Sequence, residues 1–370
     1  MTLLINNEVA RVLLTMDDTM EVLEQTYRDL ATTDAVCRPR IDVQIPTDVP
    51  GKLFQWSSME GGTTGGYFAI RMKSDILHEE HYNGAVTQEQ YCIEPGTFCG
   101  LIFLISIRNG EPLAIINDGV VQHLRVGADG GIGVKYMARE DAAVVGMLGS
   151  GGMARAHMEA FTRVRPIKML RVFSPTAANR EQFGAEMREN YGIEVVICDC
   201  PEDVYKGADI IAALTDSAVP VLDARCIEQG SHIVNVGGGG GRPSDAVLKK
   251  VDLYLRFGTA PAPWTLPEFD VPDEYITYAA RQDIIKSFGM KRPGKRGHGI
   301  AKPDRMVNFS DIVQGTTRGR TSVDQITYSE RGNLQGAQFY GVAGKIYELA
   351  KASGLGHHLP TEWFVQDIRN

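Results

Sequence analysis

The sequence predicts an α/β fold with a doubly wound parallel sheet in the middle of the chain and a discontinuous α+β domain around it. Short apolar, β-branched stretches alternate with stretches of helical periodicity between residues 142 and 236. Strands that alternate with helices form parallel sheets with helices on both faces. A last helical stretch, 332–353, is expected to fold back onto the N-terminal region, which would make that domain discontinuous.

A glycine-rich turn after the first strand of this alternation predicts that the sheet binds a dinucleotide. It matches the G-x-G-x-x-G/A dinucleotide fingerprint of Rossmann-type domains. Gly149 permits the tight turn, Gly151 lets the backbone approach a pyrophosphate, and Ala154 allows close helix–strand packing. The next helix offers free N–H groups and a positive dipole end to phosphates. The residues expected to bind the cofactor here are Gly149, Ser150, Gly151, Gly152, Met153 and Ala154. With 40 glycines in the chain, the βαβ context carries the prediction, and a turn that binds nothing is the alternative.

The expected elements follow in chain order, each with its own signal. An amphipathic stripe predicts a helix over 17–32, and an Asn-Gly turn predicts a hairpin between strands 100–107 and 112–117. The other expected strands are 67–73, 142–148, 168–173, 194–198, 209–214 and 232–236, and the other helices are 120–138, 153–164 and 177–190. Segment 264–302 is rich in proline, glycine and charge, so we expect an insertion or lid with a helix around 273–288. We expect 54–66 and the polar, aromatic loop 74–96 to line or cover the pocket.

The residues at the end of the second Rossmann strand indicate which nicotinamide cofactor is preferred. NAD-preferring sites carry an acidic residue there, which bonds the ribose 2′-hydroxyl. This strand ends instead in Ser174 and Thr176, with Arg180 on the next helix. Hydroxyls and a guanidinium suit a 2′-phosphate, so NADP(H) is favoured over NAD(H). The alternative is a solvated Arg180 and a site that takes either cofactor.

Composition excludes several classes of partner. The chain has 370 residues, 38 Lys and Arg against 46 Asp and Glu, and a net charge of −8, which argues against nucleic acid. It has no run of eighteen apolar residues and no basic, apolar leader, so we expect a cytoplasmic protein without a membrane span. Six scattered cysteines include no C-x-x-C pair, and His78-Glu79-Glu80-His81 lacks the i, i+4 spacing of a helical zinc motif. We expect no metal and interpret the histidine segment as an exposed charged turn.

These residues together resemble the ornithine cyclodeaminase/μ-crystallin family. The resemblance covers most of the chain and rests on an ordered set of segments: 38–41, the strand that ends at Lys73, 110–113, 121–128, the glycine turn, 208–211 with Thr215 and Ser217, and 319–322. It implies a homodimer whose substrate and dimerisation domain spans 1–137 with 322–370, and whose NAD(P)-binding domain spans 138–321. It also implies action on the C–N bond of a small amino or imino acid.

The resemblance carries over to individual positions. Arg40, Lys73 and Arg125 match the family's basic substrate-site positions, and Thr215, Ser217, Val236 and Gly237 match its cofactor-binding positions. Arginine clamps a carboxylate better than lysine does, while partial burial of Lys73 would lower its pKa and suit it to proton transfer. The family's cyclodeaminases carry an Asp where this chain has Gly239, and Asp245 could replace it only if the loop folds back. This departure puts ornithine cyclisation in doubt.

Three functions remain to be weighed. The leading hypothesis is an NADP(H)-dependent oxidoreductase that reduces a ketimine or imino acid, or runs the reverse amino acid dehydrogenase reaction. The second is a cyclodeaminase, an ammonia lyase that recycles bound NAD(P) within one turnover. The third is a binding protein that holds NADPH or a small ligand without turnover. The basic triplet favours the first over the third, and Gly239 argues against the second.

Overall fold

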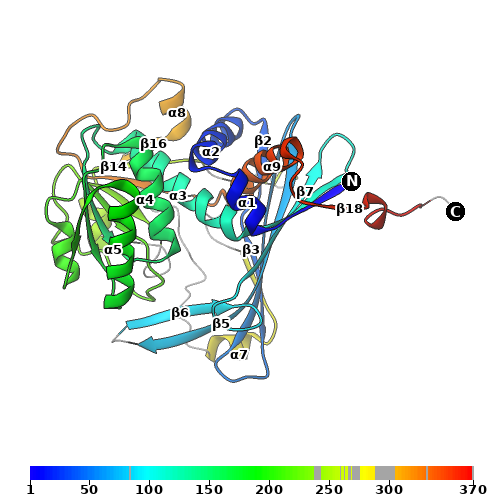
Figure 1. Cartoon of the computed structure of the whole chain (residues 1–370), viewed down its shortest axis with the longest axis horizontal. Coiled ribbons are helices and arrows are strands. Elements are labelled where there is room, and N and C mark those ends of the chain that lie inside the picture. The colour runs from blue at the N-terminus through cyan, green and yellow to red at the C-terminus, as the bar shows by residue number, and fades with distance from the viewer. Residues whose placement is uncertain are drawn as a thin grey trace.

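The computed structural model describes residues 1–82, 85–236, 243–258, 260–261, 263–265, 268, 276–287, 305–330 and 332–368. Two sheets organise these residues (Figure 1). The predicted Rossmann-type α/β fold is confirmed. None of the described helices is long and apolar enough to cross a membrane.

The larger sheet has the strand order β15-β3-β4-β5-β7-β8-β1-β18, with β2 paired to β4 and β6 paired to β5. Its strands are β1 (Thr2–Ile5), β2 (Ala35–Cys37), β3 (Ile41–Pro46), β4 (Leu53–Thr63), β5 (Tyr67–Tyr82), β6 (Ala85–Tyr91), β7 (Cys99–Ser106), β8 (Pro112–Asn117), β15 (Ile276–Ala279) and β18 (His357–Leu359). Helices α1 (Asn7–Leu13), α2 (Met16–Ala31) and α9 (Gln335–Ser353) accompany it. Gly61 of β4 meets the backbone of Gly336 so closely that a Cβ would lie 2.8 Å away, which is why glycines stand at this crossing.

The second sheet is parallel, in the order β11-β10-β9-β12-β13-β17-β14-β16. Its strands are β9 (Val144–Leu148), β10 (Met169–Phe173), β11 (Glu194–Ile197), β12 (Ile210–Ala213), β13 (His232–Asn235), β14 (Leu253–Arg256), β16 (Met306–Asn308) and β17 (Thr327–Glu330). Its helices are α4 (Gly152–Val164), α5 (Ala177–Tyr191), α6 (Asp245–Lys250), α8 (Phe309–Val313) and the 3-10 turn η1 (Pro201–Tyr205). Helix α3 (Asp118–Met137) connects the two sheets and packs on α4, where Gly127 meets Ala156 at backbone distance.

Two expectations about loops are wrong. Segment 74–96 is largely not a loop, because β5 continues to Tyr82 and returns as β6. The resulting hairpin reaches under the nucleotide-binding sheet (Figure 1). His78 therefore lies within a strand rather than an exposed turn, and its Nε2 lies 3.0 Å from Glu80. The reason is that polar and aromatic residues such as those of 78–82 suit a strand exposed on one side as well as a loop.

Segment 264–302 is only partly described. Its described part contains β15, which pairs in parallel with β3, and the short helix α7 (Gln282–Ser287). The expected helix around 273–288 is therefore wrong at 276–279, where β-branched and aromatic residues extend the larger sheet, while 273–275 and 288 lie outside the described residues. The boundary at 321/322 stays a prediction, while β17 pairs with β13 and β14 inside the nucleotide-binding sheet.

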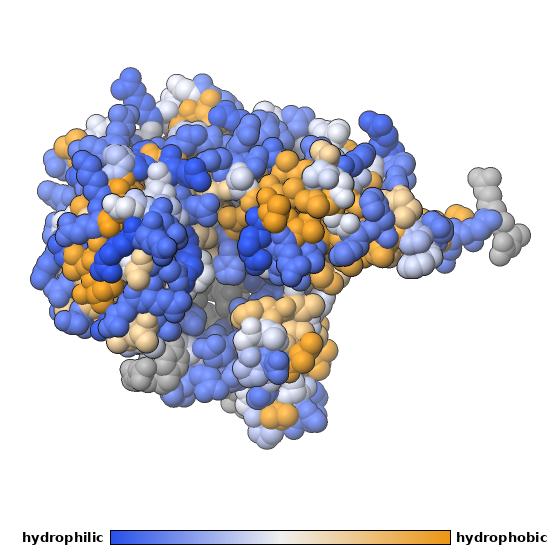
Figure 2. Space-filling view, in the orientation of Figure 1, coloured by the Kyte–Doolittle hydropathy of each residue, from blue (hydrophilic) through white to orange (hydrophobic). Residues whose placement is uncertain are grey.

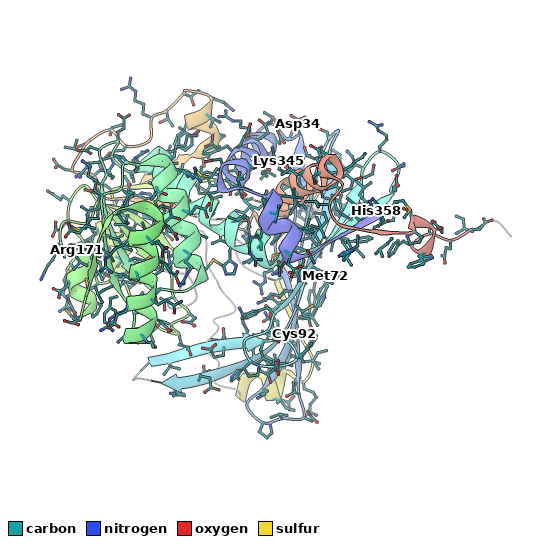
Figure 3. The ribbon with its side chains drawn as sticks, viewed as in Figure 1. Asp34, Met72, Cys92, Arg171, Lys345 and His358 are labelled. Atoms are coloured by element: carbon teal, nitrogen blue, oxygen red, sulfur yellow. The ribbon has the colours of Figure 1, made fainter. Side chains whose placement is uncertain are left out.

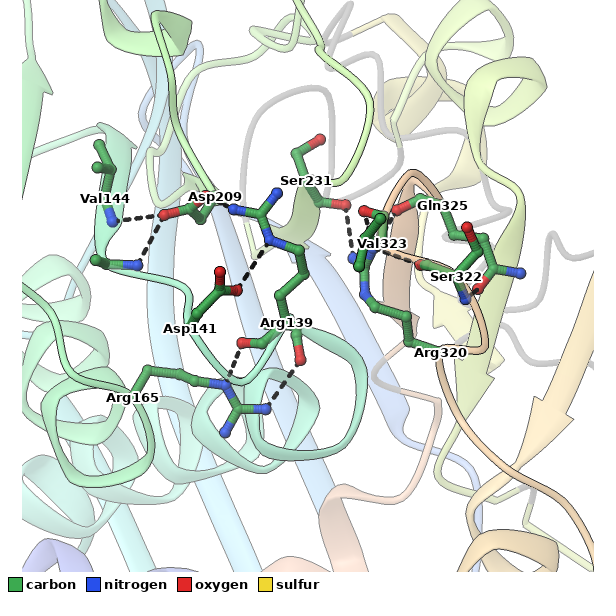
Figure 4. Close-up of polar contacts among 12 residues, drawn as sticks. Arg139, Asp141, Val144, Arg165, Asp209, Ser231, Arg320, Ser322, Val323 and Gln325 are labelled. Carbon is green, nitrogen blue, oxygen red and sulfur yellow. Dashed lines mark hydrogen bonds and ion pairs between the residues drawn. The ribbon is translucent and has the colours of Figure 1, made fainter.

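A cluster of arginines closes the amino-terminal edge of the second sheet (Figure 4). Arg139 pairs with Asp209, which also accepts hydrogen bonds from the backbone of Ala143 and Val144 at 2.7 and 2.9 Å. Arg320 donates to the carbonyl of Met137 at 2.9 Å, and Arg165 donates to other carbonyls at the end of α3. We call Arg139, Asp209, Arg165 and Arg320 the amino-edge cluster.

Candidate active site

The predicted cofactor residues gather at the carboxyl edge of the second sheet. Gly149 follows β9, Ser174 follows β10, Thr215 follows β12 and Val236 follows β13. Parallel strands bring their carboxyl ends to one edge, and open α/β sheets bind ligands there. Gly237 lies outside the described residues, as does Gly239. Asp245 is exposed at the start of α6.

The glycine turn has the shape that a dinucleotide needs. Gly149 has φ +119°, and a Cβ there would lie 2.1 Å from the carbonyl oxygen of Leu214. Gly151 caps α4 and faces open space, with nothing within 4 Å of its Cβ direction. Helix α4 has no side-chain cap and no acidic residue in its first turn, so its N–H groups are available to phosphate. The turn therefore fits a pyrophosphate.

Side chains around the turn hold it in place. Ser150 Oγ lies 2.9 Å from Ser174 Oγ, and Arg155 donates to the Ser150 carbonyl at 2.8 Å. His123 of α3 packs against Gly152, where a Cβ would lie 2.5 Å from the imidazole Nε2. From sequence, His123 is only one residue of the segment 121–128 and has no predicted role of its own. Its contact with the turn depends on the packing of α3 against α4, which no local pattern reveals.

Arg180 lies at the tip of β10, as predicted. It donates from Nη1 to the Ser174 carbonyl at 2.9 Å and packs over the Phe173 ring. Its Nη2 lies 3.7 Å from Asp199, whose side chain is fully exposed. Thr176 caps α5 without a side-chain hydrogen bond. The guanidinium is thus oriented across the strand tip.

The predicted substrate residues lie on one face of the larger sheet. In an antiparallel sheet, directly paired residues point to the same face, and alternate residues along a strand do too. Asp42 pairs with Ser57 and Ser57 pairs with Lys73, so these side chains share a face with Arg71 and Asp75. Arg40 joins them through its ion pair with Asp42 at 2.7 Å. We call Arg40, Asp42, Ser57, Arg71, Lys73 and Asp75 the ionic face.

Each cation of the ionic face has a carboxylate partner. Arg40 also donates to Ser57 at 2.8 Å, and Arg71 pairs with Asp118 at the start of α3 at 2.5 Å. Lys73 Nζ pairs with Asp75 at 2.7 Å and donates to the Gln90 amide oxygen of β6 at 2.7 Å. Burial lowers the pKa of Lys73 to about 8, with Asp75 raising it and Arg40 and Arg71 lowering it further. The lysine therefore titrates near neutral pH.

Arg125 lies on α3 beside this face. It donates to Gln338 of α9 at 2.6 Å and to Gln122 at 2.8 Å, and its guanidinium packs over the Phe339 ring. Arg71 packs over the same ring, with its guanidinium 5.3 Å from the centroid. Because both guanidiniums pack over the Phe339 ring, Arg125 lies near Arg71 and so beside the face that holds Arg40 and Lys73.

Strand β6 joins the two predicted sites. Gln90 contacts Lys73, while Thr87 forms a bridge with Ser217 and the Ala218 N–H donates to the Val86 carbonyl at 2.9 Å. Ser217 follows β12 at the cofactor edge. The hairpin thus ties the ionic face to the nucleotide-binding sheet, and the surface is hollowed where the two parts meet (Figure 2).

Four residues of the ionic face or its partners were missed from sequence: Asp42, Arg71, Asp75 and Asp118. A period of two through Lys73 points to Arg71, which lies inside the predicted strand, and to Asp75 once that strand is extended beyond Lys73. Asp118 follows the predicted strand 112–117, and only the tertiary fold pairs it with Arg71. Among the described residues, no group of three or more His, Cys, Asp or Glu side chains could hold a metal.

The fold and these two sites define an α/β protein with a Rossmann-type sheet, a glycine turn that fits a dinucleotide and a buried, charged face on the other sheet. The chain belongs to the ornithine cyclodeaminase/mu-crystallin family, whose sequence model matches residues 81–348. The resemblance predicted from sequence is confirmed.

Similar proteins include dehydrogenases and reductases. The alanine dehydrogenase of Archaeoglobus fulgidus is 24% identical over 362 residues, which cover 96% of this chain and 97% of that protein. The Delta(1)-pyrroline-2-carboxylate reductase of Bacillus cereus is 29% identical over 264 residues, 71% of this chain and 74% of that protein. These relatives support an oxidoreductase, as predicted.

Solved structures share the fold. An archaeal alanine dehydrogenase dimer with bound NAD superposes with a TM-score of 0.72 at 23% identity, covering 97% of this chain and 99% of that one. The Delta(1)-pyrroline-2-carboxylate reductase of Thermococcus litoralis, in complex with NADH and L-proline, gives 0.70 at 21% identity, covering 97% and 100%.

Proposed function

We propose that this protein is an NADP(H)-dependent oxidoreductase that reduces the C=N bond of a small imino acid to an amino acid, or runs the reverse reaction. The observation that carries the proposal is Lys73, a buried amine with a pKa of about 8 among arginines. It lies on a face that β6 ties to the cofactor edge. A general acid works best when its pKa is near the working pH.

Each basic residue has a role in this reaction. Arg40 and Arg125 bind the substrate carboxylate, since a guanidinium makes paired hydrogen bonds with a carboxylate. Lys73 gives a proton to the imine nitrogen during reduction and takes it back in the reverse direction. The nicotinamide, when bound, supplies or accepts the hydride. The protein orients the reactants and supplies charge.

The preference for NADP(H) rests on the tip of β10. Ser174, Thr176 and Arg180 stand where an NAD-preferring site carries an acidic residue. Arg180 already contacts the Ser174 carbonyl, so little reorganisation is needed for it to meet a 2′-phosphate. The similar solved structures were determined with NAD or NADH, and the preference for NADP(H) is our inference from these three side chains.

The assembly we propose is a homodimer formed through the outer face of the larger sheet. Residues of this face alternate with fully buried ones and are apolar yet partly exposed. They are Leu4, Phe68, Ile70, Met72, Leu101, Phe103, Ile105 and Ile115. Met72 lies in the first half of β5 (Figure 3) and is 36% exposed. A contiguous apolar face of this kind is typical of an interface, and light scattering of Met72→Lys against wild type tests it.

The domain division we propose keeps residues 1–137 with the C-terminal part as the substrate and dimerisation domain. Helix α9 packs on β4 and β5 of the larger sheet, which supports the return of the chain. The NAD(P)-binding domain begins after α3, and because β17 pairs with β14 we propose to move its end from the predicted 321/322 to past residue 330.

The test follows NADPH and NADH absorbance of the purified protein against 2-keto acids with ammonia or methylamine, and against cyclic imines. We expect NADPH-selective oxidation with at least one imine. Ammonia release from ornithine or lysine without net cofactor change would instead indicate a cyclodeaminase. Tight NADPH binding without turnover on the whole panel would indicate a binding protein.

A further inference from the structure

The Lys73 amine is held by two acceptors from different strands. Asp75 lies two residues further along β5, and its carboxylate lies 2.7 Å from Nζ. Gln90 reaches Nζ from β6, also at 2.7 Å. An ammonium has three N–H donors. Among the residues that the structure describes, Gln90 accepts a hydrogen bond from Nζ and Asp75 forms an ion pair with it, so at least one donor is left for a substrate.

Asp75 is placed by the register of the sheet. It pairs with Gln55 of β4, just as Lys73 pairs with Ser57, so both side chains point to the ionic face. The Asp75 side chain is fully buried, whereas Lys73 keeps 14% of its side chain exposed. A buried carboxylate is stable only beside a cation or several hydrogen-bond donors. Asp75 therefore depends on Lys73, and Lys73 is the more accessible member of the pair.

Resting on the function proposed above, we propose that Asp75 is a positioning residue that keeps the Lys73 amine protonated and directed across the ionic face, so that Lys73 donates the proton to the substrate nitrogen. The Lys73 N–H bond breaks and a new N–H bond forms on the imine nitrogen. The imine carbon takes a hydride from the reduced nicotinamide, and the C=N bond becomes a C–N single bond. Lys73 is left as a neutral amine and regains its proton from water.

The charges around Lys73 explain why a carboxylate is needed here. Burial disfavours the charged amine most, and Arg40, just before β3, and Arg71 of β5 disfavour it further. Asp42 and Asp118 neutralise these arginines by direct ion pairs, and Arg125 lies further along the face on α3. Asp75 is the carboxylate in direct contact with the amine. Without it, the pKa of Lys73 would fall and most of the amine would be neutral at pH 7.

The test compares pH profiles of kcat/KM for imine reduction in the wild type and Asp75→Asn. Wild-type activity should fall as pH rises through about 8, because the neutral amine cannot donate a proton. Asp75→Asn should move this midpoint about 1–3 pH units lower, the size typical of losing an adjacent opposite charge. In Asp75→Glu the pH of the midpoint should return most of the way to the wild-type value. A loss of rate that is equal at every pH, with the midpoint unmoved, would overturn the proposal.

A second measurement needs no substrate. Acetic anhydride acetylates neutral amines, so the pH dependence of Lys73 acetylation, read by peptide mass spectrometry, reports its pKa. The labelling midpoint should fall in Asp75→Asn. If it does not, the inference fails whatever the activity; if it falls while no imine is reduced, the proposed function fails and the pairing stands.

Asp42→Asn is the matched control. It also removes a buried carboxylate from the ionic face, but Asp42 contacts Arg40 and Ser57 rather than the Lys73 amine. Its labelling midpoint should move by less than half as much. Equal shifts in the two variants would show a general effect of charge on the face and would overturn a specific role for Asp75.

Discussion

The ionic face and the amino-edge cluster are both groups of partly or fully buried arginines and aspartates, yet they differ in what their cations can still do. In the amino-edge cluster, Arg139, Arg165 and Arg320 bond to main-chain carbonyls and to Asp209 (Figure 4). Burial lowers the pKa of Arg320 to about 10, which still leaves this guanidinium charged near neutral pH. The ionic face instead contains Lys73, whose pKa is about 8 and whose amine retains a donor. A buried ion pair is thus no sign of a site unless one member can exchange a proton or bind a ligand.

The positions of the two groups in the fold support the same distinction between a scaffold and a site. The amino-edge cluster closes the ends of strands at which ligands do not bind in open α/β folds, whereas β6 ties the ionic face to the carboxyl edge. Asp209 and Arg320 belong to segments that carried the family resemblance. The structure gives them a scaffold role, so resemblance alone does not separate chemistry from architecture.

Removing the Lys73 amine should give the largest effect. We expect Lys73→Ala to lower kcat/KM for imine reduction about 10²–10⁴-fold, the range for loss of a general acid. NADPH affinity, followed by fluorescence, should stay within about twofold of wild type because Lys73 lies on the other sheet. A loss of activity below tenfold would contradict the assignment.

Substitution of Gly149 in the glycine turn should have the second-largest effect. Gly149→Ala places a Cβ against the Leu214 carbonyl at a φ of +119°, so the turn must shift. We expect NADPH affinity to fall about 10–100-fold, which corresponds to 1–3 kcal/mol of strain. Gly192→Ala is the control, since it also has positive φ, at +63°, but faces open space at the end of α5. It should lower the melting temperature and leave NADPH affinity unchanged.

Substitution of Arg180 should change the KM for NADPH but not the KM for NADH. Arg180→Ala should raise the KM for NADPH about tenfold, as expected for one charge-assisted hydrogen bond, and leave the KM for NADH nearly unchanged. Steady-state kinetics with both cofactors measure this. Equal changes for NADPH and NADH would remove the basis for the NADP(H) preference.

Substitutions in the amino-edge cluster should lower the free energy of unfolding rather than kcat. Asp209→Asn weakens the ion pair to Arg139 and the hydrogen bonds from Ala143 and Val144, so we expect a loss of about 1–3 kcal/mol in the free energy of unfolding. Asp141→Asn is matched, because Asp141 also pairs with Arg139 but is 82% exposed, and it should change little. Urea unfolding measures both. A large loss of kcat in Asp209→Asn with unchanged stability would reverse the comparison.

Local patterns were enough for most of the fold. The βαβ alternation, the glycine turn and the Asn-Gly hairpin each depend on residues close in sequence, and each is present. The β5–β6 hairpin was missed because polar, aromatic residues suit either a loop or a strand that is exposed on one side. The ionic face was found only in part, because the pairing of β3, β4 and β5, which no local pattern reveals, gathers its side chains on one surface. Arg71 and Asp118, for example, are separated by 47 positions and meet only when α3 folds over the sheet.

The most direct test of the central claim is the stoichiometry of a single turnover. Purified protein is mixed with NADPH and an imine from the active panel, and NADPH loss and amino acid formation are measured together by absorbance and mass spectrometry. Our account predicts one amino acid formed for each NADPH oxidised, and neither in Lys73→Ala. Ammonia released from an amino acid at constant NADPH, or equal turnover in Lys73→Ala, would contradict it.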